Sequence, residues 1–453
     1  MIFKSKILFL FLLIASFFNS FLFQQFFLLL TAIAYLYKKY KIKIDLSIKF
    51  LLLWLLTAFL SYGYNFYIND IDHYTILFWL IGYAPPMLLS LLVYSYRLDF
   101  NYIWKVFIAL VILQIVVLTI QAFQHKVFLL RDFATGTVGD ANFISFYIYL
   151  LIFYLISKKL YCQKYITRKK SFYEYLVIIV LFIYTLMTES SAMTGFFFLI
   201  GILSVIKSIN KYFMKITYKR VLLFFILFLS LTYGSYKFFD EQSKSGGSIT
   251  RINSLFILIE QNTFEELIDN PFVYKIKSYY LIFSGKIYED VNFLLGSGPS
   301  TYTSRTSFVR IPDLRSNQPP IAVPVYESAI VKKYLRDEEE QLKTASYGNL
   351  ATPKTTIVSV IVETGFIGFS FFSLFFISIY RRLLKLQKAD KENAYIYFFG
   401  KLISIYFIMI MFYINIWEYH LITFVYIILI FSILNIPLQQ RRINESLIHN
   451  SNI

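Results

Sequence analysis

The chain has 453 residues and a formal net charge of +17, and 58% of its residues are hydrophobic. Only 16% are charged, against about 25% in a typical soluble domain, so the composition excludes an ordinary soluble enzyme and a disordered chain. A single cysteine excludes a disulfide scaffold and a zinc site built from cysteines. The class that remains is an all-α, polytopic membrane protein.

Long apolar runs recur along most of the chain. A helix that crosses a membrane needs roughly 20 mostly apolar residues, and by this criterion the sequence predicts about 12 membrane helices. The predicted spans lie near residues 7–18, 21–37, 46–62, 74–96, 103–123, 142–157, 175–188, 193–209, 221–238, 357–380, 395–414 and 420–438.

Lysine and arginine gather in every second connection between these spans. Residues 38–43 and 381–391 are rich in them, whereas the alternate short connections hold only Lys126 and Arg131. This alternation follows the positive-inside rule and predicts that both termini are cytoplasmic. Most of the positive charge is therefore interpreted as a topology signal and not as a nucleic-acid-binding patch.

One connection is much longer than the others. Residues 240–353 are predicted to lie outside the membrane, and they contain seven of the ten prolines. We expect a structured helical cap, with one helix after Ser248 and another from Pro324 through Lys343. The resulting division is 1–239 with nine membrane helices, 240–353 as the large extracytoplasmic loop, 354–440 with three more helices, and 441–453 as a cytoplasmic tail.

Ionisable residues are scarce inside the predicted spans. The candidates are Glu363, Lys49, Lys105 and Lys401. A proton-coupled transporter needs a relay of carboxylates or histidines within the membrane, and this sequence lacks one. Polar residues gather instead at the external ends of the spans, which favours a substrate with a lipid tail and a polar head.

Four local patterns carry a resemblance to a known family. They are Gly139-Asp140-Ala141-Asn142, the segment Thr188–Gly195, Arg251 followed by Leu294-Leu295-Gly296-Ser297-Gly298-Pro299, and Pro353–Thr356 with Val362–Gly368. In this order and placement they resemble the O-antigen polymerase and O-antigen ligase superfamily over about residues 139–370. Lys354 stands where the ligase branch has a histidine, and residues 240–353 contain none, so the chain resembles the Wzy-type polymerase branch more closely.

The resemblance implies a metal-independent glycosyltransferase without a cofactor. It would join undecaprenyl-pyrophosphate-linked oligosaccharide repeat units at the outer face of the bacterial cytoplasmic (inner) membrane. The product would be a surface polysaccharide, either the O-antigen of lipopolysaccharide or a capsule. Membrane lipid, a chain-length regulator (Wzz-type) and a flippase (Wzx-type) are the implied partners, and nucleic acid is not.

Arginine forks suit the oxygens of a pyrophosphate leaving group, and a carboxylate can take the proton of an acceptor hydroxyl. Arg251 and Glu363 are the predicted catalytic residues, although Glu363 could instead stabilise a helix N-terminus. The predicted binding residues for pyrophosphate or sugar are Arg305, Arg310, Arg315, Lys354, Asn142 and Glu189. Other acidic candidates near the external boundary are Asp140 and Glu418, and His73 and His420 are also external.

Three other functions stay open at the level of sequence. The first is a dolichol-mannosyltransferase-like enzyme, for which Asp70-Ile71-Asp72-His73 would be the acidic, metal-binding loop. The second is a flippase for lipid-linked sugars. The third is the O-antigen ligase, which the missing histidine disfavours.

Overall fold

The computed structural model describes residues 2–18, 21–37, 44–125, 137, 141–161, 168–188, 193–200, 274–302, 326, 328–335 and 355–440. Over these ranges the chain is helical, and its one β-type contact is an isolated bridge between Asn292 and Gly296. The prediction of an all-α membrane protein is confirmed at this level.

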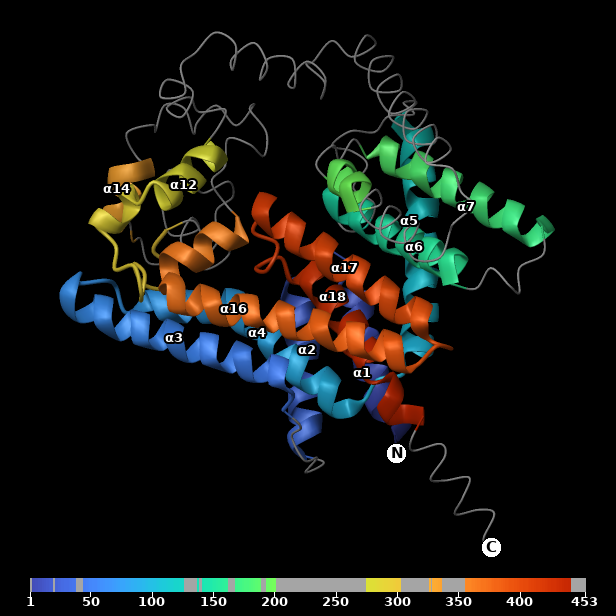
Figure 1. Cartoon of the computed structure of the whole chain (residues 1–453), viewed down its shortest axis with the longest axis horizontal. Helices are drawn as coiled ribbons and strands as arrows, with labels where there is room; N and C mark the ends of the chain where they lie inside the picture. The colour runs from blue at the N-terminus through green and yellow to red at the C-terminus, as the bar shows by residue number, and fades with distance from the viewer. Residues whose placement is uncertain are drawn as a thin grey trace, which may run out of the picture.

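The helices follow the apolar runs (Figure 1). In chain order they are α1 (Ile2–Ala15), α2 (Phe21–Tyr37), α3 (Leu46–Ile68), α4 (Tyr74–Tyr96), α5 (Phe100–His125), α6 (Ala141–Tyr161), α7 (Arg168–Met187), α12 (Tyr274–Phe283), the 3-10 helix η4 (Lys286–Glu289), α14 (Ala329–Leu335), α16 (Thr356–Ala389), α17 (Ala394–Tyr413) and α18 (His420–Leu434). Residues 193–200 are also helical.

The prediction of 12 spans is wrong. Within the described residues, six helices are long and apolar enough to cross a membrane, namely α3, α4, α5, α6, α16 and α17. The helices α1 and α18 contain 14 and 15 residues, which at 1.5 Å per residue reach only about 21–23 Å of the roughly 30 Å hydrocarbon core. Hydropathy detects apolar runs of this kind, but it does not measure how long the resulting helix will be.

Three more predicted spans need separate comment. Helix α7 has 20 residues, but it begins at Arg168-Lys169-Lys170, and its apolar part is confined to Tyr173–Thr185. The span predicted at 193–209 is described only through residue 200, and the one at 221–238 lies outside the described residues. The membrane orientation of the termini stays a prediction.

Helices α3 and α16 form the base of the bundle. Helices α3 and α16 lie side by side along most of their length, with α4 against α3 and α17 against α16 (Figure 1). Trp54 of α3 inserts between Phe372 of α16 and Trp417, with ring centroids 4.5 and 5.9 Å away. Aromatic rings packed edge to face fill a core without leaving voids, which holds α3, α16 and the α17–α18 connection together.

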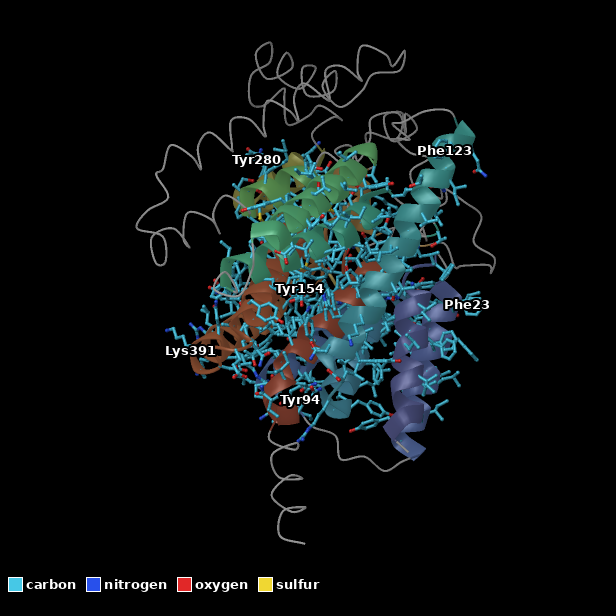
Figure 2. All side chains as sticks on the ribbon, turned by 90° about the vertical axis from the view of Figure 1, so that its right-hand side faces the viewer. Phe23, Tyr94, Phe123, Tyr154, Tyr280 and Lys391 are labelled. Carbon is cyan, nitrogen blue, oxygen red and sulfur yellow. The ribbon has the colours of Figure 1, made fainter. Side chains whose placement is uncertain are left out.

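Helix α18 is the central element. Every residue from His420 to Leu434 is buried, and the helix is apolar on all sides. A helix that is hydrophobic all round belongs in an interior, and α18 lies against α4, α5 and α17. Helix α2 is the opposite case, since Leu22, Phe23 and Leu36 are 77%, 60% and 68% exposed. Figure 2 shows Phe23 pointing away from the bundle, as expected of a side chain that faces lipid.

A smaller second core joins the long loop to the bundle. It combines Ile287, Tyr302 and Val331 from the loop with Val358 and Val362 of α16. The loop segment therefore does not form an independent domain over its described part, because the first turns of α16 complete its core. Helix α12 is tied to the bundle as well, since the Tyr279 hydroxyl donates to the Phe412 carbonyl at 2.7 Å.

Candidate functional site

Helix α16 is broken at Gly365. This residue has φ 67° and ψ −175°, which divides α16 into a short N-terminal half and a longer C-terminal half. A break exposes carbonyls on one side and amides on the other, and in an apolar bundle each of these groups needs a partner. The break therefore raises the question of what satisfies them.

The partner is the segment 292–302 of the long loop. Ser297 N and Gly298 N donate to the carbonyls of Val362 and Glu363 at 2.7 and 3.2 Å. On the other side of the break, Phe366 N and Ile367 N donate to the carbonyls of Phe293 and Leu294 at 2.9 and 3.3 Å. We call this arrangement the clasp; it consists of residues 292–302 and 362–367.

Glycine makes the clasp possible. A Cβ atom on Gly296 would lie 2.5 Å from the Val362 oxygen, and one on Gly365 would lie 2.2 Å from the Leu294 oxygen. Gly296 and Gly298 have φ of 78° and 103°, a region that other residues rarely adopt. In the sequence, Leu294–Pro299 is one of the patterns that carry the family resemblance, but nothing there predicts that this segment docks into a helix break.

Glu363 holds the far side of the clasp. Its side chain is fully buried, and its two carboxylate oxygens accept hydrogen bonds from Ser300 N at 3.0 Å and Tyr302 N at 3.2 Å. Ser300 has φ 55°, so this turn is held in a conformation that is rare for serine. Hydrogen bonds from backbone amides to a carboxylate are stronger than those between neutral groups, and here they fix the path of the loop.

Helix α3 closes the clasp from below. Ser61 Oγ donates to the Glu363 carbonyl at 3.0 Å, and Asn65 Nδ2 donates to the Gly296 carbonyl at 3.0 Å. Trp54 Nε1 donates to Thr364 Oγ1 at 3.2 Å. Three side chains of one helix face therefore bind both halves of the clasp.

A second buried polar cluster lies along the N-terminal half of α16. Asn415 Nδ2 donates to Glu418 Oε1 at 2.9 Å, and Thr356 Oγ1 donates to Asn415 Oδ1 at 3.2 Å. Ser359 Oγ lies 3.5 Å from Asn415 Nδ2, and Ser359 precedes Glu363 by one helical turn. Glu418 is only 4% exposed. This cluster places a second carboxylate at the same end of the bundle as Glu363.

Two of the sequence patterns reach the same end. The start of α6 meets the end of α7 through a hydrogen bond between Ser145 Oγ and Thr188 Oγ1, and it meets the α17–α18 connection through Phe143 and Tyr419, whose rings are 5.0 Å apart. Asn142, the second residue of α6, is half-buried beside these contacts.

An open pocket of about 270 Å³ adjoins the clasp. Its polar lining includes Asn69, Asp290, Ser297, Ser328 and Lys333. Lys333 Nζ and the Tyr334 hydroxyl each donate to Asp290 Oδ2 at 2.6 Å. The hydrogen bond from Lys333 is the main reason that the pKa of Asp290 lies below its ordinary value, so Asp290 stays an ionised acceptor in mildly acid solution.

Lys275 is a buried lysine near the end of α17. It lies on α12 and is 4% exposed, and its Nζ is 4.0 Å from the centre of the Tyr413 ring. Burial lowers the pKa of Lys275 to about 7. The sequence did not point to Lys275, because nothing in a lysine-rich segment distinguishes the lysine that becomes buried.

The structure describes only part of the predicted site. Glu363 and Asn142 lie at the end of the bundle that carries the clasp, as described above. The remaining predicted residues lie outside the described ranges: Arg251, Arg305, Arg310, Arg315, Lys354 and Glu189. Among the polar residues that sequence reasoning did not single out, Asn415, Ser359 and Asn65 are buried at this end. Their signal was weak, since isolated amides and serines are common at the ends of apolar runs.

His420 and Asp72, two further residues named from the sequence, hydrogen-bond to neighbouring helices. His420 Nε2 donates to the Gly82 carbonyl at 2.8 Å, and His420 Nδ1 accepts from Gln25 Nε2 at 2.7 Å, a tautomer assigned from these partners. This histidine therefore joins α2, α4 and α18. Asp72 Oδ1 accepts from Tyr74 N at 2.7 Å at the start of α4. In the part of the chain that the structure describes, no group of three or more His, Cys, Asp or Glu side chains could hold a metal ion.

Comparison of the chain with models of known protein families and with curated proteins finds no match.

Proposed function

We propose that the protein is a membrane glycosyltransferase of the Wzy type, which joins lipid-linked oligosaccharide repeat units into a surface polysaccharide. In this proposal the reaction takes place at the end of the bundle that carries the clasp, and this end faces the outside of the bacterial cytoplasmic membrane. The lipid tail of each substrate stays in the bilayer beside the apolar helices.

The observation that carries the proposal is the pocket beside the clasp. Its lining offers an amide, a carboxylate, two hydroxyls and an amine, from Asn69, Asp290, Ser297, Ser328 and Lys333. Sugars are recognised through such donors and acceptors, whereas an apolar substrate is not. Directly below, the bundle is built from apolar helices of membrane-spanning length. A sugar head in the pocket and a lipid tail along the bundle match an amphipathic, lipid-linked substrate.

The residues divide into three proposed roles. Arg251, Arg305, Arg310, Arg315 and Lys354 supply positive charge for the pyrophosphate leaving group. Asn142 and Glu189 bind polar parts of the substrate. Glu363 is assigned to positioning of the loop, because both of its carboxylate oxygens accept hydrogen bonds from backbone amides of the loop that lines the pocket. The catalytic role predicted for Glu363 stays a prediction, and Glu418 is the second carboxylate to test as the general base.

The first experiment is deletion of the gene in its own host, followed by a size ladder of the surface polysaccharide. Collapse of the ladder to a single repeat unit supports the polymerase. Long polymer that accumulates on its lipid carrier indicates the ligase instead, and an unchanged ladder rejects both assignments.

Variants then test the assigned charge. When the Arg251→Ala variant is expressed in the deletion strain, it is expected to restore no long polymer. Lys332→Ala is the matched control and should restore the ladder, since Lys332 is exposed on α14 and does not line the pocket. Membrane insertion of both variants is checked by fractionation. A wild-type ladder from inserted Arg251→Ala protein contradicts the role of this arginine.

A further inference from the structure

A second groove lies at the opposite end of the bundle from the clasp. It has a volume of about 370 Å³ and runs between the start of α3 and the C-terminal half of α16. Its lining residues are Asp45, Leu46, Ser47, Phe50, Leu374, Ile377, Ser378, Arg381, Arg382 and Lys385. We call it the basic groove, because it carries three cations and one carboxylate.

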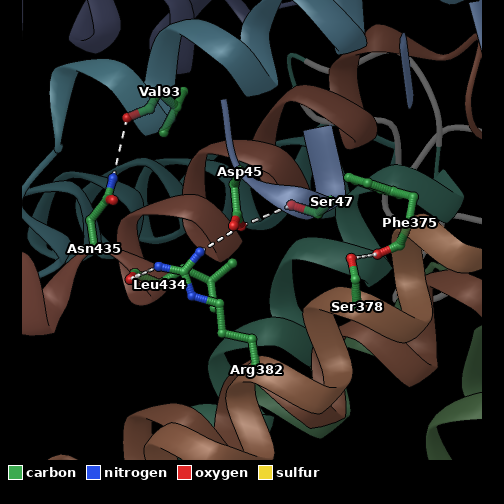
Figure 3. A network of polar contacts seen from close by, with 8 residues as sticks. All are labelled: Asp45, Ser47, Val93, Phe375, Ser378, Arg382, Leu434 and Asn435. Atoms are coloured by element: carbon green, nitrogen blue, oxygen red, sulfur yellow. Dashed lines mark hydrogen bonds and ion pairs between the residues drawn. The ribbon is translucent and has the colours of Figure 1, made fainter. Parts of the chain in front are cut away.

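One of the three cations is already neutralised. Arg382 Nη1 donates to Asp45 Oδ2 at 2.5 Å, and Arg382 Nη2 donates to the Leu434 carbonyl at 3.3 Å (Figure 3). Figure 3 shows the guanidinium of Arg382 between these two acceptors, with Ser47 on the far side of Asp45. Asp45 and Arg382 thus join α3, α16 and the end of α18, which is a structural task.

The other two cations face outward. Arg381 and Lys385 are exposed, and they lie one turn apart on the same face of α16. Among the described residues, the ion pair in this groove joins Asp45 to Arg382. No described carboxylate forms an ion pair with Arg381 or Lys385. The groove therefore presents a net positive charge that an anionic ligand can neutralise.

The depth of the groove matches a membrane surface. Residues 356–380 of α16 contain no lysine or arginine, and Arg381 follows them directly. Because α16 is long and apolar enough to cross a membrane, the first basic residues after its apolar run are expected to reach the headgroups. Leu374 and Ile377 line the groove further from the basic end and are 36% and 44% exposed. Arg381 and Lys385 thus lie at headgroup depth, and the apolar part of the groove lies at the depth of acyl chains.

We propose that the basic groove binds an anionic phospholipid, with its phosphate between Arg381 and Lys385 and one acyl chain along Phe50, Leu374 and Ile377. Basic pockets between membrane helices select anionic headgroups in this way. A free phosphate ion would use the two cations but would gain nothing from the apolar wall. The combination of paired cations and a continuous apolar lining is what favours a lipid.

The test uses the full-length protein in detergent, titrated with phosphatidylglycerol, with phosphatidylcholine as the uncharged comparison, and read by native mass spectrometry. The phosphatidylglycerol complex is expected to be the tighter one. The double variant R381Q/K385Q is expected to bind it roughly thirtyfold more weakly, since each basic residue near a membrane surface contributes about 1 kcal/mol.

The matched control is K388Q/K391Q, which removes the same charge from exposed positions near the same helix end but outside the groove. It is expected to bind phosphatidylglycerol as the wild type does. Ile377→Trp fills the apolar wall and keeps both cations, so it is expected to weaken the lipid complex as well. Thermal unfolding confirms that each variant is folded.

Three results would overturn the proposal. Equal affinity of wild type and R381Q/K385Q would remove the role of the cations. Equal binding of phosphatidylcholine would show a merely apolar groove. Full competition by millimolar inorganic phosphate, with no effect of Ile377→Trp, would show an anion site that does not recognise lipid.

Discussion

The backbones of Gly296 and Gly365 meet with no room for a side chain between them. A Cβ atom on Gly296 would lie 2.6 Å from the Gly365 nitrogen, and a Cβ atom on Gly365 would lie 2.6 Å from the Gly296 nitrogen. Gly296 comes from the long loop and Gly365 from a helix of membrane-spanning length, so the contact fixes the position of the loop against the bundle. Ser297, the neighbour of Gly296, lines the pocket, so a change that separates the two glycines also displaces part of the pocket lining.

Gly365→Ala is expected to lower the free energy of unfolding by about 3 kcal/mol or more, because it combines a left-handed backbone with a clash against Leu294. Gly63→Ala is the control, since Gly63 lies inside α3 and has nothing within 4 Å of an added Cβ. Thermal unfolding in detergent measures both. Equal melting temperatures would mean that the clasp contributes nothing to stability.

Glu363→Ala is expected to destabilise the clasp by about 2–4 kcal/mol, because it leaves the amides of Ser300 and Tyr302 without an acceptor. Hydrogen exchange of these two amides is the direct measurement and should accelerate. Glu363→Gln keeps one acceptor oxygen and is expected to lose less. If Glu363→Gln instead stops polymerisation and leaves both exchange and melting unchanged, Glu363 is catalytic and not a positioning residue.

Lys275 gives a pH dependence with a defined sign. Its pKa of about 7 in the folded protein lies below the value of an unfolded lysine, so the unfolded chain binds more protons between these two values. Stability should therefore rise with pH from about 7 to about 10.4. Lys275→Met should remove this rise and stabilise the protein at pH 7, whereas Lys332→Met on the exposed face of α14 should keep it. Parallel curves for wild type and Lys275→Met would contradict the buried charge.

Asp290→Asn is expected to reduce polymer formation about tenfold, since a hydrogen bond to a charged acceptor contributes about 1.5–3 kcal/mol. Because the pKa of Asp290 lies below the ordinary value of an aspartate, its carboxylate is still ionised at that ordinary value. The contribution of Asp290 to transfer should therefore be lost only when the pH falls through the lowered pKa. Glu289→Gln, at the exposed neighbouring position, is the control. Repeat-unit transfer by purified protein at several pH values measures the effect, and equal rates for the two variants would remove Asp290 from the sugar site.

Polymerisation is expected to continue in EDTA, because the proposed site stabilises the pyrophosphate with arginine and lysine. The assay is repeat-unit transfer with and without the chelator. Loss of activity that Mg²⁺ or Mn²⁺ restores would point to a metal-dependent enzyme and revive the role of Asp70–His73.

The sequence predicts helices well where apolar runs have clear polar borders. Tyr74–Tyr96 was expected at 74–96, and Ala394–Tyr413 at 395–414. It could not predict the break in α16, since Gly365 lies inside a run that reads as one continuous span. The break depends on hydrogen bonds to residues about 70 positions away, and no local pattern encodes such pairing.

The same limit applies to the candidate site. Glu363 was found because a carboxylate inside an apolar run is costly and therefore conspicuous. Asn65 and Ser359 were not found, since neutral polar residues cost less and occur in many membrane helices. Their role follows from burial and partners, which only the folded chain provides.

The clasp also constrains the order in which the molecule can be assembled. The segment 292–302 leaves the ribosome well before residues 362–367, so its amides wait in water until their carbonyl partners arrive. A nascent chain that stops short of α16 would carry a loop with nowhere to dock and a face of α3, around Ser61 and Asn65, with no complement. Completion of the clasp therefore waits for the synthesis of α16, so the loop and α3 reach their final contacts only after most of the chain has been made.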